Sequence, residues 1–168
     1  MKRRIAVSLW NALSKMEGMK YDVRFSYILA KNKIALKPEI EILNELKKSS
    51  PDYLEFENKR VELAQKYCDR DSSGTLKIIN NQFVIKEKQL FEEEIIKLKT
   101  EYMKPIENRE KQLKEYEVFL NEDIYFTPAK VKFSYLPSQI ESSLMEILIE
   151  AGIIEDDIDD TSKIVTTP

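Results

Sequence analysis

One acidic, turn-forming stretch carries the chain's clearest set of metal-ligating side chains. Oxygen-bearing residues occupy positions 1, 3 and 5, a glycine occupies position 6 and an apolar residue position 8, in Asp69-Arg70-Asp71-Ser72-Ser73-Gly74-Thr75-Leu76. This is the residue order of an EF-hand calcium loop. The closing position of such a loop needs a bidentate glutamate, but here it is Asn80. We therefore favour a polar turn that ends a helix, and keep a weak calcium site at Asp69, Asp71 and Ser73 as the alternative.

The chain lacks the residues that usually carry acid–base or covalent catalysis. It has no histidine, which is the commonest proton-transfer group near neutral pH and the commonest metal ligand. The single cysteine, Cys68, follows a seven-residue repeat with Leu54 and Val61, where it packs as a small hydrophobic residue. The acidic run 92–94 and Glu101 lie among lysines, so we expect surface ion pairs there. The sequence predicts no enzyme and no cofactor.

Composition indicates helices with narrow buried stripes and wide charged faces. The chain has 168 residues, of which 42% are hydrophobic and 34% charged, and only three are glycine, too few for the turns of an all-β domain. The net charge of −3 argues against a nucleic-acid partner, with Lys2-Arg3-Arg4 as the one local basic cluster. We also expect no secretory signal and no membrane span, because no apolar run is long enough.

Hydrophobic periodicity predicts helices in the first part of the chain. Helical spacing extends from Ile5 to Met16, and the stretch 21–36 also fits a helix better than a strand. Pro38 predicts a kink or a short break. A new helix is expected at Ser49-Ser50-Pro51-Asp52, with a serine cap and a proline in the first turn. Along this helix, two adjacent rows of hydrophobic residues repeat every seven positions. They suggest that the helix packs against two neighbouring segments.

A β-hairpin is predicted between two long charged helical arms. Its tip is Asn80-Asn81, because asparagine tolerates the positive φ angles of a tight turn. The second arm begins near Leu90 and is interrupted at Pro105. We expect a mainly α fold in which a long, kinked, antiparallel and coiled-coil-like helical hairpin carries a small β-ribbon near residues 75–85.

After Asn121 the sequence pattern no longer predicts long helices. Extended segments are expected near residues 123–135, and a capping box formed by Ser138 and Glu141 opens a last helix that ends at Gly152. The remainder, 153–168, is acidic and is expected to be a flexible tail. The prediction is one helical domain over residues 1–152.

Several motifs resemble those of a family of small helical proteins of unassigned function that are common in tailed-phage and prophage genomes. The motifs lie at residues 25–32, 36–39, 53–67, 119–122 and 136–140. That family has no assigned catalytic residues, and its Asp–Gly stretch varies, as a turn would. The resemblance implies a phage or prophage origin, a non-enzymatic role, and a location in the cytoplasm of the infected bacterium or in the virion.

We therefore expect a non-catalytic phage protein–protein interaction module. It would act as a virion-assembly or structural factor, or as a small binder of a host or defence component, and would also self-associate. The expected contact residues are aromatic side chains that the core does not need: Tyr53, Phe56, Phe83, Tyr102, Tyr116 and Tyr125.

Overall fold

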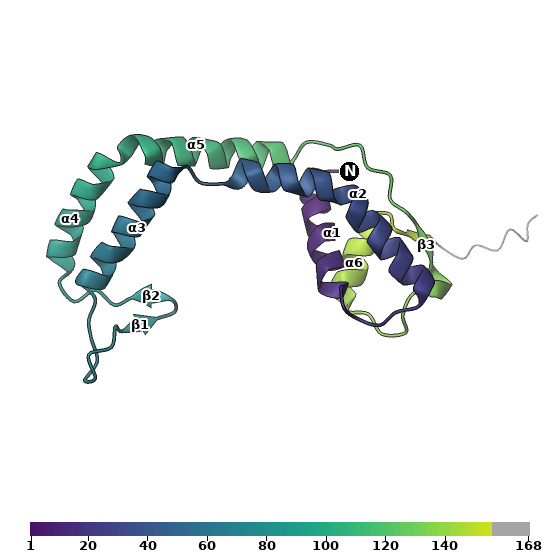
Figure 1. The fold of residues 1–168 in the computed structure, drawn as a ribbon, viewed down its shortest axis with the longest axis horizontal. Coiled ribbons are helices and arrows are strands. Elements are labelled where there is room, and N and C mark those ends of the chain that lie inside the picture. Colours follow the sequence, from purple (N-terminus) through teal and green to yellow (C-terminus); the bar gives the residue numbers. More distant parts are fainter. Residues whose placement is uncertain (156–168) are drawn as a thin grey trace, which may run out of the picture. The chain divides into compact units, whose positions relative to one another are not determined.

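The computed structural model describes residues 1–155 and is mainly helical (Figure 1). The helices are α1 (Arg3–Met16), α2 (Val23–Lys47), α3 (Pro51–Lys66), α4 (Lys88–Glu101), α5 (Met103–Leu120) and α6 (Ser142–Glu150), with a short 3-10 helix, η1, at Phe133–Tyr135. The strands are β1 (Ile78–Ile79), β2 (Gln82–Phe83), β3 (Val131–Lys132) and β4 (Ile154–Glu155). The predicted mainly α fold with its β-ribbon and C-terminal helix is confirmed, whereas its coiled-coil character stays a prediction.

The chain folds as two compact units. Unit 1 comprises Met1–Leu46 and Glu117–Pro168, and unit 2 comprises Lys47–Tyr116. The sequence predicted one domain that ends at residue 152. In the structure, Ile153 is fully buried and Ile154–Glu155 form β4, so packing continues beyond that boundary. The rest of the predicted tail, residues 156–168, lies outside the described residues.

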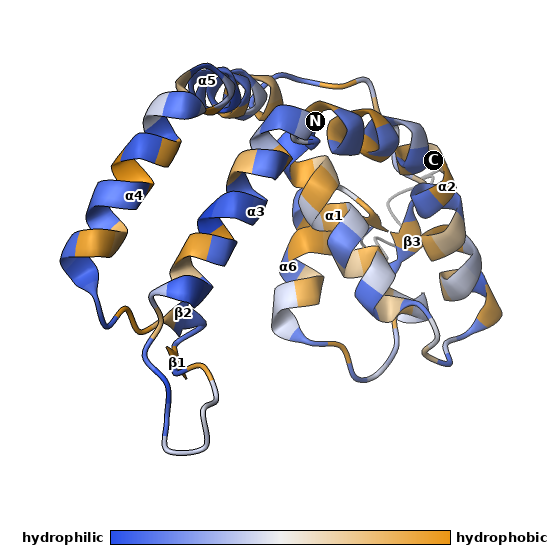
Figure 2. Ribbon diagram, turned by 60° about the vertical axis from the view of Figure 1, so that its left-hand side comes forward, coloured by the Kyte–Doolittle hydropathy of each residue, from blue (hydrophilic) through white to orange (hydrophobic). Residues whose placement is uncertain are grey.

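Unit 1 has a continuous core between α1, α2 and α6. Helices α1 and α6 pack side by side (Figures 1 and 2). The parallel pair β3–β4 joins Val131 to Ile154. The core's fully buried large side chains are Leu9, Met16, Phe25, Leu36, Leu43, Leu148 and Ile153. The predicted helix over residues 5–16 is confirmed as α1.

Helix α2 runs through Pro38, so the predicted break at this residue is wrong. Proline removes one backbone hydrogen bond and costs about 3 kcal/mol inside a helix. Its ring lies on the exposed side of α2, while Leu36 and Ile40 on either side are buried in the core. Core packing therefore maintains the helix, and the predicted kink is visible as a change of direction along α2 (Figure 1).

Unit 2 is built on α3 and α4, which lie side by side. As predicted, Ser50 caps α3, because its side chain accepts a hydrogen bond from the Tyr53 backbone N–H at 3.2 Å. The prediction of two buried rows is wrong, since Leu54 and Val61 are 52% and 37% exposed. Within this unit α3 packs mainly against α4, and one apolar stripe is enough for that contact.

The predicted β-ribbon is confirmed, with its tip where the sequence placed it. Strands β1 and β2 are antiparallel, with Ile78 opposite Phe83 and Ile79 opposite Gln82. Asn80 and Asn81 adopt φ angles of 50° and 60°, which are those of a type I′ hairpin turn. The second arm is interrupted at Tyr102, between α4 and α5, and Pro105 lies in the first turn of α5.

The predicted capping box at Ser138 and Glu141 is wrong. Helix α6 begins at Ser142 with Glu141 as N-cap, and no side chain caps it. Leu136 is extended, as expected for a residue before proline, Glu141 is extended as well, and residues 137–140 form no helix. The extended region predicted near 123–135 is present in part: Ile124 exchanges hydrogen bonds with Met1, Val131–Lys132 form β3, and residues 133–135 form η1.

Candidate partner-binding surfaces

The N-terminal basic cluster is fully engaged in ion pairs within unit 1. Lys2 binds Asp123 at 2.7 Å, and Arg4 binds Glu117 at 2.8 Å. Arg3 binds Glu39 at 2.6 Å and Glu122 at 2.9 Å, and its guanidinium lies over the Phe119 ring. These cations join α1 to neighbouring segments of unit 1.

The EF-hand-like stretch folds as a polar turn. One carboxylate oxygen of Asp71, Oδ1, accepts hydrogen bonds from the Ser73 N–H, the Ser73 hydroxyl and the Thr75 N–H at 2.6–3.0 Å. These bonds, led by the one from the Ser73 hydroxyl, lower the pKa of Asp71. The Asp69 carboxylate lies 3.8 Å from the Lys77 ammonium. Both acids therefore have partners inside the turn, which favours the turn interpretation.

Cys68 and Glu94 are the other groups that were considered for chemistry, and both contact neighbouring residues of the fold. Cys68 is buried, and its thiol contacts the backbone oxygens of Asp69 and Lys77. Glu94, from the acidic run, pairs with the Lys66 ammonium at 3.1 Å and accepts a 2.8 Å hydrogen bond from the Tyr67 hydroxyl. Within residues 1–155, no group of three or more cysteine, aspartate or glutamate side chains could hold a metal ion.

Unit 2 contains a hydrogen-bonded lysine–tyrosine–glutamate cluster. Lys59 donates to the Tyr102 hydroxyl at 2.6 Å, and this hydroxyl donates to Glu55 at 2.7 Å. The hydrogen bond to Tyr102, followed by that to Glu55, raises the pKa of Lys59. The Lys59 contact lowers the pKa of Tyr102, but Glu55 and burial raise it more. Through its hydrogen bonds to Tyr102, the cluster joins α3 to the α4–α5 junction.

The six aromatic residues predicted to contact partners have very different surroundings. Phe56 and Tyr102 are only 5% and 8% exposed and form the unit 2 core with Leu98. Their assignment as free contact residues is therefore corrected, because this unit has few other large side chains to bury. Tyr53, Phe83 and Tyr116 are half-buried, and Tyr125 is 99% exposed. Tyr125 belongs to unit 1 and the other five to unit 2.

A groove of about 500 Å³ lies in unit 1 between the first half of α2 and strand β3. We call it the α2 groove. Val23, Tyr27 and Ile28 of α2 form one side. The other lining residues are Val131 and Tyr135, together with the charged residues Arg24, Lys130, Lys132 and Glu155. Most of its wall is therefore apolar, and most of its charge is positive.

A buried asparagine fixes the wall of the α2 groove. Asn32 is 1% exposed, donates to the Ala129 carbonyl at 2.8 Å and accepts from the Ala129 N–H at 2.8 Å. Ala129 directly precedes Lys130 and Val131, and the Val131 N–H is bound to the Ile153 carbonyl at 2.8 Å. The segment that carries two of the groove's cations is therefore held on both sides.

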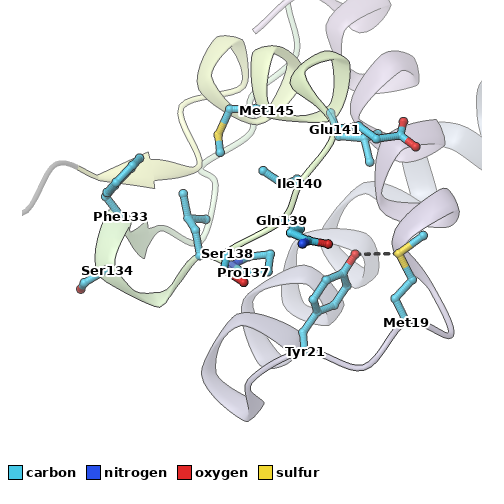
Figure 3. Close-up of a pocket in the computed structure, with 12 residues that line it drawn as sticks. Met19, Tyr21, Phe133, Ser134, Pro137, Ser138, Gln139, Ile140, Glu141 and Met145 are labelled. Carbon is cyan, nitrogen blue, oxygen red and sulfur yellow. Dashed lines mark hydrogen bonds between the residues drawn. The ribbon is translucent and has the colours of Figure 1, made fainter.

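A second, wider cavity of about 850 Å³ lies in unit 1 beside the segment 133–141 (Figure 3). Met19 and Tyr21 lie on one side of it, and Phe133 and Ser134 lie on the other. The Tyr21 hydroxyl is directed to the Met19 sulfur at 2.8 Å. The lining residues include one charged side chain, Glu141, so this cavity offers fewer groups to orient a ligand than the α2 groove.

The exposed apolar side chains of α2 were not singled out from the sequence. Val23, Tyr27 and Ile34 are 81%, 63% and 73% exposed, and their i, i+4, i+11 spacing places them on one face. Buried residues occupy the opposite face, so α2 is apolar on two sides; Figure 2 shows hydrophobic and hydrophilic residues intermixed along it. The sequence signal for such a second face is that the apolar residues of α2 do not gather on a single stripe.

Comparisons with known proteins do not add a relationship. No family model matches the chain, and neither the curated proteins nor the solved structures yielded a match. The resemblance to tailed-phage proteins therefore stays a prediction. In the described part of the chain, no helix combines the length and the apolar character needed to cross a membrane.

Proposed function

We propose that the protein is a non-catalytic interaction module that binds a protein partner through the outer face of α2. This α2 face consists of Val23, Tyr27 and Ile34. The observation that carries the proposal is the exposure of these three residues, between 63% and 81%, on one face of a well-packed helix. Two of the three also line the α2 groove.

The cost of leaving this face in water supports an interaction role. Each large apolar side chain gains about 1.5–3 kcal/mol when it is fully buried. Single exposed apolar residues are ordinary, but a contiguous apolar patch beside a groove is typical of an interaction site. An aromatic residue flanked by aliphatic residues is also the usual composition of the energetic centre of a protein interface.

We propose a phage context for this module on the strength of the motif resemblance alone. In that context the partner is a virion component or a host or defence protein, encountered in the infected bacterium or in the particle. Self-association is a separate proposal, supported by exposed apolar residues on α3 such as Leu54. Light scattering after size-exclusion chromatography would test it.

The proposed partner interaction is tested by comparing captures with matched baits. The tagged full-length protein, a Tyr27→Asp/Ile34→Asp variant and a control are used as baits in lysate of the native host, with quantitative mass spectrometry. The control is Ile149→Asp, which changes a 60% exposed apolar residue on α6. We expect a protein that is enriched by the wild type and the control but lost with the α2 variant. Equal enrichment by all three baits would overturn the proposal.

The calcium alternative has its own test. Because Asp71 Oδ1 already accepts three hydrogen bonds and Asn80 replaces the closing glutamate, we expect no change in Tm when millimolar calcium is added. Differential scanning fluorimetry provides the measurement. A saturable rise in Tm that disappears in an Asp71→Ala variant would establish a calcium site.

A further inference from the structure

We propose that the α2 groove binds an acidic, apolar segment of the partner protein. The proposal specifies the chemical character of the partner segment that binds at this surface, and it rests on the proposed function. It combines the groove's apolar wall with an excess of positive charge at its rim.

The rim cations are not neutralised by the described part of the chain. Arg24, Lys130 and Lys132 line the groove and are exposed, and within residues 1–155 none of them forms an ion pair. Among residues 1–155, the only carboxylate in the lining is that of Glu155. Three cations therefore face one anion, and complementary charge on a ligand would be stabilised there.

The apolar wall of the groove determines which uncharged side chains the ligand needs. Both Val131, which is 3% exposed, and Tyr27, which is 63% exposed, line the groove. The Arg24 guanidinium lies 4.8 Å from the centre of the Tyr135 ring, so this cation is held beside apolar surface. A ligand that fills the groove needs apolar side chains between its acidic ones.

Other anionic macromolecules fit this combination less well. Nucleic-acid binding depends on many phosphate contacts, and the chain carries a net charge of −3. An anionic membrane surface attracts each basic residue by only about 1 kcal/mol, so three cations give weak binding. A concave site with apolar walls and a few charged groups is typical of a small-molecule or side-chain pocket rather than of a lipid surface.

The test uses a defined peptide and the full-length protein. The probe is a short fluorescein-labelled peptide in which leucines and a tryptophan alternate with glutamates, and binding is followed by fluorescence anisotropy. A neutral analogue carries glutamine in place of every glutamate. We expect the acidic peptide to bind about tenfold more tightly than the neutral one at low salt, because several exposed ion pairs together contribute this much. The difference should shrink as salt is added.

Variants locate the binding on the protein. Lys130→Gln/Lys132→Gln is expected to weaken the acidic peptide several-fold, whereas the matched surface change Lys111→Gln/Lys114→Gln in unit 2 leaves it unchanged. Equal binding of the acidic and neutral peptides would overturn the acidic chemistry. If bait capture still depends on Tyr27 and Ile34 in that case, the proposed interaction role stands without it.

Two further arms exclude other occupants. Binding to phosphatidylserine vesicles that depends on Lys130 and Lys132, without peptide binding, would overturn the proposal in favour of anionic lipid.

In the sequence, Asp156, Asp157, Asp159 and Asp160 follow Glu155. If changing these four residues to asparagine in the full chain leaves peptide affinity unchanged, a separate acidic partner is supported. A tenfold gain would show that the chain's own carboxylates compete for the groove, and would overturn the proposal.

Discussion

The two units of this protein bury their hydrophobic residues in different ways. All of the largest fully buried side chains, from Phe25 and Leu36 to Leu148 and Ile153, belong to unit 1. In unit 2 the core consists of Phe56, Leu98 and Tyr102, each still 5–8% exposed. Unit 1 is stabilised mainly by packing. Unit 2 combines a thin apolar core with hydrogen-bonded polar side chains. We call the Lys59–Tyr102–Glu55 cluster its polar clamp.

This difference supports the proposed location of the partner-binding surface in unit 1. The core of unit 1 is complete without Val23, Tyr27 and Ile34, so these residues remain exposed on a helix that other residues hold in place. In unit 2, by contrast, two of the aromatic residues that sequence reasoning assigned to a partner, Phe56 and Tyr102, are used by the core. A thin core leaves fewer large side chains for an interface.

The largest expected effect is the loss of a core aromatic ring. Phe25→Ala should destabilise the protein by about 3–5 kcal/mol, because the ring is fully buried and the dense packing around it cannot collapse into the space. Phe56→Ala should cost less, since the thin core of unit 2 can relax. Chemical denaturation with amide exchange measures both changes and shows which unit responds. Equal costs for the two changes would remove the distinction between the two cores.

The next effect concerns the buried asparagine of unit 1. Asn32→Ala leaves the Ala129 N–H and carbonyl without their partner, which should cost about 2–3 kcal/mol. It should also weaken peptide binding at the α2 groove, because Lys130 and Val131 follow Ala129. The matched change Asn121→Ala removes an exposed hydrogen bond and should have little effect. Unchanged stability of Asn32→Ala would refute the positioning role.

A smaller effect is expected from the polar clamp of unit 2. Tyr102→Phe keeps the ring in the core but removes the hydroxyl that accepts from Lys59 and donates to Glu55. We expect a fall in Tm of a few degrees, and no change for the exposed control Tyr125→Phe. Scanning calorimetry measures both. If the Tm of Tyr102→Phe equals that of the wild type, the clamp does not stabilise this unit.

The smallest effect is a pH dependence at Glu94. The Tyr67 hydroxyl and then the Lys66 ammonium lower the pKa of this carboxyl. The stabilisation is therefore present above the ordinary glutamate pKa, about 4.3, and is lost as pH falls through the lowered value. Glu94→Gln should be less stable than the wild type at pH 7, and the two should converge in acid. A difference that persists in acid, or one shared by Glu92→Gln, would contradict this assignment.

Local signals allowed much of the fold to be predicted. The β-ribbon depends on two adjacent asparagines that accept positive φ, and the start of α3 depends on Ser50 and Pro51. These features are determined by residues close in sequence. At Pro38 the sequence predicted a kink or a short break, and the helix continues because buried residues on its other side outweigh the lost hydrogen bond.

The binding surface could not be predicted in the same way because its parts are distant in sequence. The groove joins α2 to β3, and β3 is held by Ile153 and by Asn32, which contacts a residue 97 positions away. A lone asparagine among alanine and lysine gives no sign of such a contact. The choice of Phe56 and Tyr102 as contact residues failed for the related reason that burial depends on which helices pack together.

Amide hydrogen exchange of the protein with and without its captured partner tests the central claim most directly. If the α2 face and groove form the interface, the partner should slow exchange in residues 23–34 of α2 and in residues 129–132, and should leave β1, β2 and α3 unchanged. Protection confined to the β-ribbon or to α3 and α4, with no change in α2, would contradict binding through unit 1.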